Sequence, residues 1–132
     1  MNRFKVKVSE NNLRHGRLIN SHGSLSIPFF MPDATRAFVK VNTNNEIKKV
    51  GTEVMVVNTF HLYLQPGVKI IKRIGGIHNF MNWQGPILSD SGGFQIFSLI
   101  YKGEKMGKVD NDKVIFKSPL DGSQHELSPE KS

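Results

Sequence analysis

An aspartate follows an apolar, strand-like segment in the stretch SDSGGFQIF, residues 89–97. Asp90 is preceded by the pair Ile87–Leu88 and followed by Ser91 and two glycines. A carboxyl group at the end of a buried strand loses hydration and favours its neutral form unless hydrogen-bond donors compensate. Such a group is suited to proton transfer as a general acid or base. The position equally suits a helix cap or a structural hydrogen-bond acceptor, so both interpretations stay open.

The residues after Asp90 offer little steric bulk and one aromatic ring. Gly92 and Gly93 allow a flat ligand or a phosphate to approach the backbone closely, and they are also typical of a tight turn. Phe94 is able to stack on a planar base. An aromatic residue between glycine and glutamine is also common in a hydrophobic core.

Two amides and one histidine accompany this motif. Asn58 and Gln95 are able to hold a carboxylate by hydrogen bonds, and ordinary loop polarity is the alternative. His61 follows Asn58 by three residues, but a lone histidine more often packs or caps than reacts. The remaining histidines have no metal-ligand spacing, and the chain has no cysteine. We therefore expect neither a disulfide nor a thiolate metal site in these residues.

The hydrophobic pattern predicts strands and helices in alternation, which is typical of a parallel sheet with helical crossovers. Capping signals and glycines mark the helix ends, among them a capping box of Thr43 and Glu46. The expected elements are an antiparallel sheet in 1–27, a buried strand at 29–31 ended by Pro32, a helix at 43–51, a buried strand at 53–59, a helix at 66–76 and a buried strand at 86–88. A hairpin in 101–127 and the first turn of a helix at 128–132 follow. Trp83 is expected to anchor packing between helix and strand.

Ligands of parallel α/β folds bind at the carboxyl ends of the strands. The three predicted parallel strands run into Asp33 to Arg36, into Asn58 and Thr59, and into Asp90 to Gly93. All three ends are therefore expected to face one rim.

Charge and hydropathy limit the function classes. The formal net charge is +7, of which residues 1–50 carry +6 and the rest +1. A basic half suggests a polyanionic partner such as nucleic acid. The basic N-terminus lacks the apolar run of a signal peptide, and no segment approaches the ~18 apolar residues of a membrane span. We expect a cytoplasmic protein without membrane contact.

Long motifs in this chain resemble the tRNA-guanine transglycosylases, the bacterial queuine tRNA-ribosyltransferases. The resemblance covers about residues 3–132 and rests on FFMPDATRAFVK, VVNTFHLYLQPG, GGIHNFMNWQGPILSDSGGFQIFSL and FKSPLDGSQHELSPE. It implies a (β/α)8 barrel preceded by an antiparallel sheet, of which residues 28–100 would form the first three βα units and 101–127 an inserted hairpin. It also implies a pentosyltransferase that exchanges guanine at the tRNA wobble position for a 7-deazaguanine during queuosine biosynthesis.

The resemblance also implies roles for single residues. Asp90 matches the general acid/base that binds the heterocycle. Ser91, Gly92, Gly93 and Phe94 match the adjoining substrate-binding segment, with Phe94 stacked on the base. Asn58 and Gln95 match residues that position the aspartate.

The family's aspartate nucleophile and its Cys/His zinc site have no counterpart in these 132 residues. Three strands cannot close a barrel, and an open parallel edge favours aggregation. The chain is therefore expected to be an incomplete N-terminal portion, inactive alone, with zinc bound only in the full-length family. The expected partners are tRNA, the guanine or 7-deazaguanine base, and either a second copy or a complementing C-terminal chain. The alternative function is a non-catalytic tRNA-binding or partner subunit.

Overall fold

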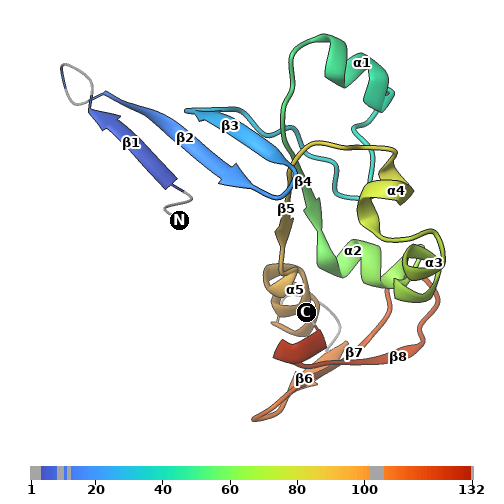
Figure 1. The fold of residues 1–132 in the computed structure, drawn as a ribbon. Helices are drawn as coiled ribbons and strands as arrows, with labels where there is room; N and C mark the ends of the chain where they lie inside the picture. Colours follow the sequence, from blue (N-terminus) through green and yellow to red (C-terminus); the bar gives the residue numbers. More distant parts are fainter. Residues whose placement is uncertain (1–3, 9–10, 12, 102–105, 132) are drawn as a thin grey trace.

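The N-terminal strands form the predicted antiparallel sheet. This computed structural model describes residues 4–8, 11, 13–101 and 106–131. The strands β1 (Phe4–Val8), β2 (Arg14–Asn20) and β3 (Gly23–Ile27) pair in the order β1-β2-β3. The sheet projects away from the rest of the chain, to one side of the strands that follow it (Figure 1). The chain is therefore a mixed α/β protein that opens with a small antiparallel sheet.

Two parallel strands form the centre of the remaining structure. The strand β4 (Met55–Asn58) pairs with β5 (Ile87–Asp90) in parallel. A single parallel bridge joins Asp33 to Val56 on the other side of β4, and the Ala34 N–H donates to the Val56 carbonyl at 2.8 Å. The chain therefore passes three times in the same direction, in the predicted order.

The prediction of a buried strand at residues 29–31 is wrong. These residues lie in no strand, and Phe30 is 82 % exposed. Pro28 and Pro32 flank the segment, and proline has no N–H to donate to a ladder. Only the Pro32 carbonyl, which accepts from the Val56 N–H at 3.1 Å, and the bridge at Asp33 remain of the predicted strand.

Burial differs between the two parallel strands. Met55 and Val57 of β4 are almost fully buried, as predicted for a strand covered on both faces. In β5, by contrast, Leu88 is 49 % exposed and Asp90 is exposed, so the predicted burial of this strand is wrong. The cause is the face from which each side chain projects, because Ile87 packs against the core cluster around Met55, whereas Leu88 points to the other face and belongs to neither described core cluster.

The helices are shorter and more numerous than predicted. The helix α1 (Asn44–Lys49) has the predicted capping box between Thr43 and Glu46. The helix α3 (Val68–Arg73) begins two residues after Pro66, so the predicted helix at 66–76 was too long. The pattern missed three more helices, α2 (Thr59–Leu64), α4 (Ile77–Met81) and α5 (Gly93–Tyr101).

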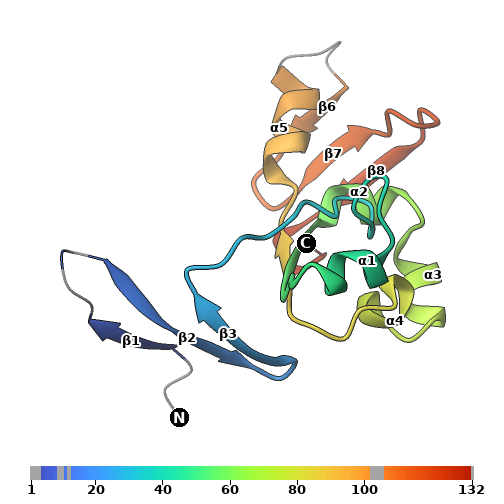
Figure 2. The same ribbon diagram turned by 90° about the horizontal axis from the view of Figure 1, so that it is seen from above.

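The last part of the described chain forms a three-stranded antiparallel sheet, where only a hairpin was predicted. Its strands are β6 (Gly107–Val109), β7 (Val114–Lys117) and β8 (Gln124–Leu127), followed by a single 3-10 turn, η1 (Pro129–Lys131), at the predicted helix start. The sheet lies beside α5 and α2 in both views (Figures 1 and 2). Its core residues Phe116 and Leu127 pack with Phe60 and Ile96, which fixes both helices.

A second core cluster holds β4 against the helices. It joins Ile47 of α1, Met55 of β4, Leu62 of α2 and Met81 of α4 with Trp83. Trp83 is 4 % exposed and its indole N–H donates to the Pro86 carbonyl at 3.2 Å, which confirms it as a packing anchor. No described helix is long and apolar enough to cross a membrane.

Two stacked imidazoles join the N-terminal sheet to α4. The rings of His22, in the β2–β3 turn, and His78 lie 3.7 Å apart and nearly parallel. The His78 Nε2–H donates to the Gly85 carbonyl at 3.2 Å, just before β5. Burial, and then the neighbouring His22, lower the pKa of His78.

This lowered pKa predicts that acid weakens the fold. A histidine whose folded-state pKa lies below its unfolded value takes up protons on unfolding, so its contribution to stability is complete above the unfolded value of about 6.5. That contribution falls as the pH drops through the folded value. We expect the free energy of unfolding to decrease between pH 7.5 and pH 5, and His78→Gln to make this decrease smaller. Urea unfolding at both pH values measures it, and an unchanged decrease in the variant would contradict the prediction.

Candidate functional site

The parallel register brings two of the predicted site residues into contact. Asn58 lies opposite Asp90 at the carboxyl end of the β4–β5 pair. The Asn58 Nδ2–H donates to the Asp90 Oδ2 at 2.9 Å, and the Gly92 N–H donates to Asp90 Oδ1 at 2.9 Å. Each carboxylate oxygen therefore has one donor, which fixes the group at the rim.

Asn58 has two structural tasks at once. Its side chain is buried, and its Oδ1 accepts from the backbone N–H of His61 at 3.4 Å, which caps α2. Because the oxygen faces the helix, the amide nitrogen must face Asp90. A single side chain thus links the end of β4, the start of α2 and the end of β5.

Asp90 is exposed, whereas a buried acid was expected. The reason is that Asp90 projects from the same face of β5 as the exposed Leu88. Its carboxylate is held from one side by Asn58 and Gly92 and is accessible from the other. This arrangement presents a positioned proton acceptor or donor to a molecule approaching the rim.

The two glycines of the motif differ in their surroundings. Gly92 has a φ of +76°, and a Cβ there would lie 2.4 Å from Phe60 Cβ, so the backbone packs directly on α2. Gly93 begins α5, and a Cβ there would meet only Ser91 Oγ, at 3.5 Å. The tight-turn interpretation therefore fits Gly92, while Gly93 borders open space.

The other residues of the motif lie on or just before α5. Ser91 Oγ accepts from the Gly93 N–H at 3.3 Å. Phe94 is 67 % exposed, so it is not the core residue that was the alternative. The Gln95 Oε1 is buried and has no hydrogen-bond partner among the described residues, so the contacts that position Asp90 come from Asn58 and Gly92 instead.

A basic cavity of about 520 Å³ lies on the other side of the β4 end, between the 33–40 loop and α2. Its polar lining consists of Asp33, Thr35, Arg36, Lys40 and His61. Burial, and then the Arg36 charge, lower the pKa of His61, while Asp33 opposes this. The sequence motifs did not single out Lys40. The charge excess of residues 1–50 is the one sequence feature that could have drawn attention to it.

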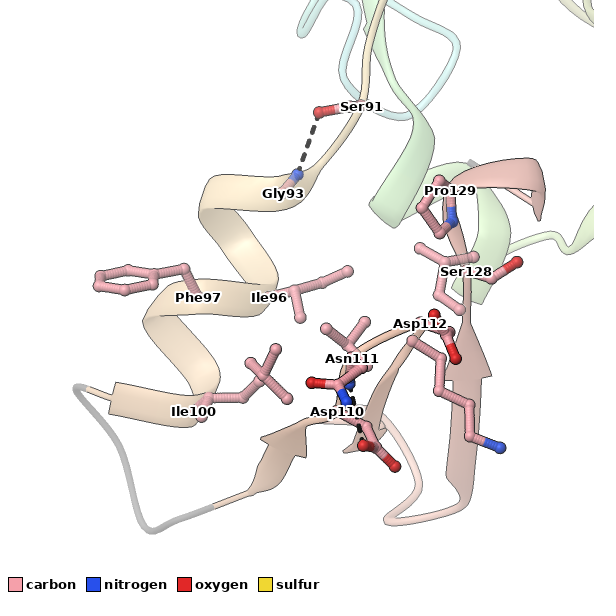
Figure 3. A pocket seen from close by; sticks show the side chains of 14 residues that line it. Ser91, Gly93, Ile96, Phe97, Ile100, Asp110, Asn111, Asp112, Ser128 and Pro129 are labelled. Atoms are coloured by element: carbon pink, nitrogen blue, oxygen red, sulfur yellow. Dashed lines mark hydrogen bonds between the residues drawn. The ribbon is translucent and has the colours of Figure 1, made fainter.

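A more apolar cavity of about 370 Å³ lies behind the motif, between α5 and the β6–β8 sheet (Figure 3). Ile96 and Ile100 form its wall, and Ser91 and Gly93 border it. Asp90 is not among its lining residues, so this cavity is separate from the carboxylate. No cluster of three metal-ligating side chains occurs in the described ranges.

Fold and site together define a mixed α/β protein with an amide-held carboxylate at the end of parallel strands. Residues 9–132 match the family model described as queuine tRNA-ribosyltransferase. Curated relatives with that name are 48 % identical in Roseiflexus sp. (strain RS-1), over 98 % of this chain and 36 % of the relative, and 45 % identical in Thermosipho africanus (strain TCF52B), over 98 % and 34 %. A third, from Prochlorococcus marinus, is 50 % identical over 98 % and 34 %.

This chain belongs to the queuine tRNA-ribosyltransferase family. It spans about a third of the length of the curated relatives it matches.

Substitution of the two glycines separates their roles. We expect Gly92→Ala to destabilise the fold by about 1–3 kcal/mol, because the new methyl group overlaps Phe60 and the backbone has a positive φ. Gly93→Ala is the matched control and should be neutral or stabilising by up to ~1 kcal/mol, since alanine favours a helix. Chemical denaturation measures both, and equal effects of the two substitutions would refute this assignment.

Proposed function

We propose that this chain supplies the acid–base part of an active site that exchanges guanine in tRNA for a 7-deazaguanine. Family membership supports the reaction class, and the geometry of Asp90 is the observation that carries the assignment. An exposed carboxylate with both oxygens fixed is ready to transfer a proton without rearranging.

The proposed chemistry makes specific demands on the rim. When the bond between C1′ and the base nitrogen breaks, its electron pair goes to the base, and a proton delivered to the ring makes the base a better leaving group. Asp90 would supply that proton and recover one from the incoming base. Phe94 is exposed and would stack on the ring, and the open space at Gly93 would accept its edge. The aspartate that attacks C1′ would lie in the part of the full-length family members that has no counterpart in this chain.

The finer fold assignment also stays a proposal. The passes at Asp33, β4 and β5 run in one direction and lie in sequential order, as the first strands of a (β/α)8 barrel would. On this proposal, residues 1–27 precede the barrel, 28–100 form its first units, 101–127 are an insertion and 128–132 begin the next helix.

The proposed partners follow from the family and from the edge of β5, which has no strand neighbour among the described residues. They are tRNA, guanine or a 7-deazaguanine, and a homodimer partner or complementing C-terminal chain, in a cytoplasmic location. Zinc would be bound outside these residues, because this chain contains no cysteine. The second candidate function, a partner subunit that completes another chain, is favoured by the exposure of Leu88 on one face of β5.

A chimaera tests the function directly. We expect no incorporation of radiolabelled guanine into tRNA by the 132-residue chain alone. Joining it to the remaining two thirds of the Thermosipho africanus relative should give incorporation, and Asp90→Asn should then lower kcat by about 10²–10⁴-fold, because proton transfer is lost. Asp121→Asn, in the β7–β8 turn, is the control for charge. Activity of the isolated chain, or an Asp90→Asn chimaera within tenfold of the parent, would overturn the proposal.

A further inference from the structure

The N-terminal sheet has one face on which basic side chains are directly opposite one another. Side chains alternate along a strand, and the register places Lys5 opposite Arg17 and Lys7 opposite His15. All four residues are exposed. We call these four residues, together with Ser24 and Ser26 of β3 on the same side, the cationic face.

Nothing in the described part of the chain neutralises this face. The one ion pair found there joins Lys113 to Glu126 in the distant β6–β8 sheet. Like charges placed directly opposite in a sheet destabilise it. The pairing of Lys5 with Arg17 is therefore unfavourable for folding, which suggests that the face serves another purpose.

The opposite face of the sheet carries most of its apolar side chains and one basic residue, Arg14. Leu18 and Leu25 are opposite each other there, and Leu25 is 2 % exposed. Phe4 and Val6 on this apolar face are 51 % and 44 % exposed, so access does not separate the two faces, and the distinction is the charge of the cationic face. On it, the Arg17 Nε–H donates to Ser24 Oγ at 3.0 Å, which leaves the terminal guanidinium nitrogens available for a phosphate.

We propose that the cationic face binds the phosphate backbone of RNA, at a place separate from the Asp90 rim. The inference rests on the proposed function in taking tRNA as the partner. The sheet lies at the amino-terminal side of β5, since His22 stacks on His78 and His78 bonds the carbonyl of Gly85. Asp90 is the last residue of β5 and therefore lies at the other end of this strand. The face would contact the tRNA away from the exchanged base, through charge and without reading the sequence.

An anionic membrane is the other polyanion that such a face would suit. Surfaces that bind membranes combine cations with large apolar side chains that insert among the lipids. Among the residues of β1, β2 and β3 whose side chains alternate to this side, Ile19 is the single large apolar one. The composition of the face therefore favours RNA.

The proposal predicts opposite effects on stability and on binding. The test variant is Lys5→Gln/Lys7→Gln, and the control is Lys48→Gln/Lys49→Gln, which removes the same charge from the last turn of α1. Fluorescence anisotropy with an unmodified tRNA transcript at several KCl concentrations measures the affinity of the 132-residue chain. We expect the test variant to lower the slope of log K against log[KCl] by about 1.4–1.8 and to weaken binding at least tenfold at low salt.

The melting temperature without RNA provides the second readout. It should rise in the test variant, because like-charge repulsion is removed, and fall slightly in the control, because lysines stabilise a helix C-terminus. A slope equal to that of the control, or a lower melting temperature of the test variant, would overturn the proposal. Retained RNA affinity together with lost sedimentation on phosphatidylserine vesicles would assign the face to membranes instead.

Kinetics of the chimaera separate this proposal from the proposed function. With Lys5→Gln/Lys7→Gln, the chimaera should have a higher KM for tRNA and an unchanged kcat. If no chimaera exchanges guanine but the test variant still loses RNA affinity, the proposed function fails and the cationic face stands. If exchange depends on Asp90 but the KM for tRNA does not change, only the cationic face fails.

Discussion

The two hydrogen bonds of the Asn58 amide are the interactions on which the candidate site depends. The amide caps α2 through its oxygen and holds Asp90 through its nitrogen. The orientation of the amide that makes one of these bonds therefore also makes the other. Removing this side chain would leave the first N–H groups of α2 without their cap and the carboxylate with one donor fewer. The position of Asp90 is thereby tied to helix capping, which a protein must satisfy in any case to fold.

The Asn58–Asp90 contact in turn depends on the unequal environment of the two parallel strands. The strand β4 is fixed by the core cluster around Met55 and Trp83, while β5 is held mainly through its pairing with β4. Gly92 extends that support, since its backbone rests on Phe60 and donates to Asp90. The carboxylate is therefore well positioned even though its own strand is largely exposed.

Much of this arrangement could be predicted from the sequence, for identifiable reasons. The rule that polar residues gather at the carboxyl ends of parallel strands placed Asn58 and Asp90 together, and the capping box of Thr43 and Glu46 located α1. The helix α2 was missed because Asn58 both ends a strand and caps a helix with no loop between them. The burial of β5 was overestimated because an apolar pair such as Ile87–Leu88 indicates a partner without saying whether this chain contains it.

Two exposed surfaces of this chain are unfavourable for its stability, each for a different physical reason. Leu88 and Phe94 expose apolar area near the rim, which is unfavourable in water and becomes favourable when another surface covers it. Lys5 and Arg17 instead repel each other, and an anion bound between them would offset this repulsion. The first kind of surface suits protein or a stacked base and the second suits phosphate. The two surfaces lie at opposite ends of β5. A nucleic acid that contacted both would therefore run along the side of the molecule. Its length would then affect which nucleic acid binds, in addition to the base at the rim.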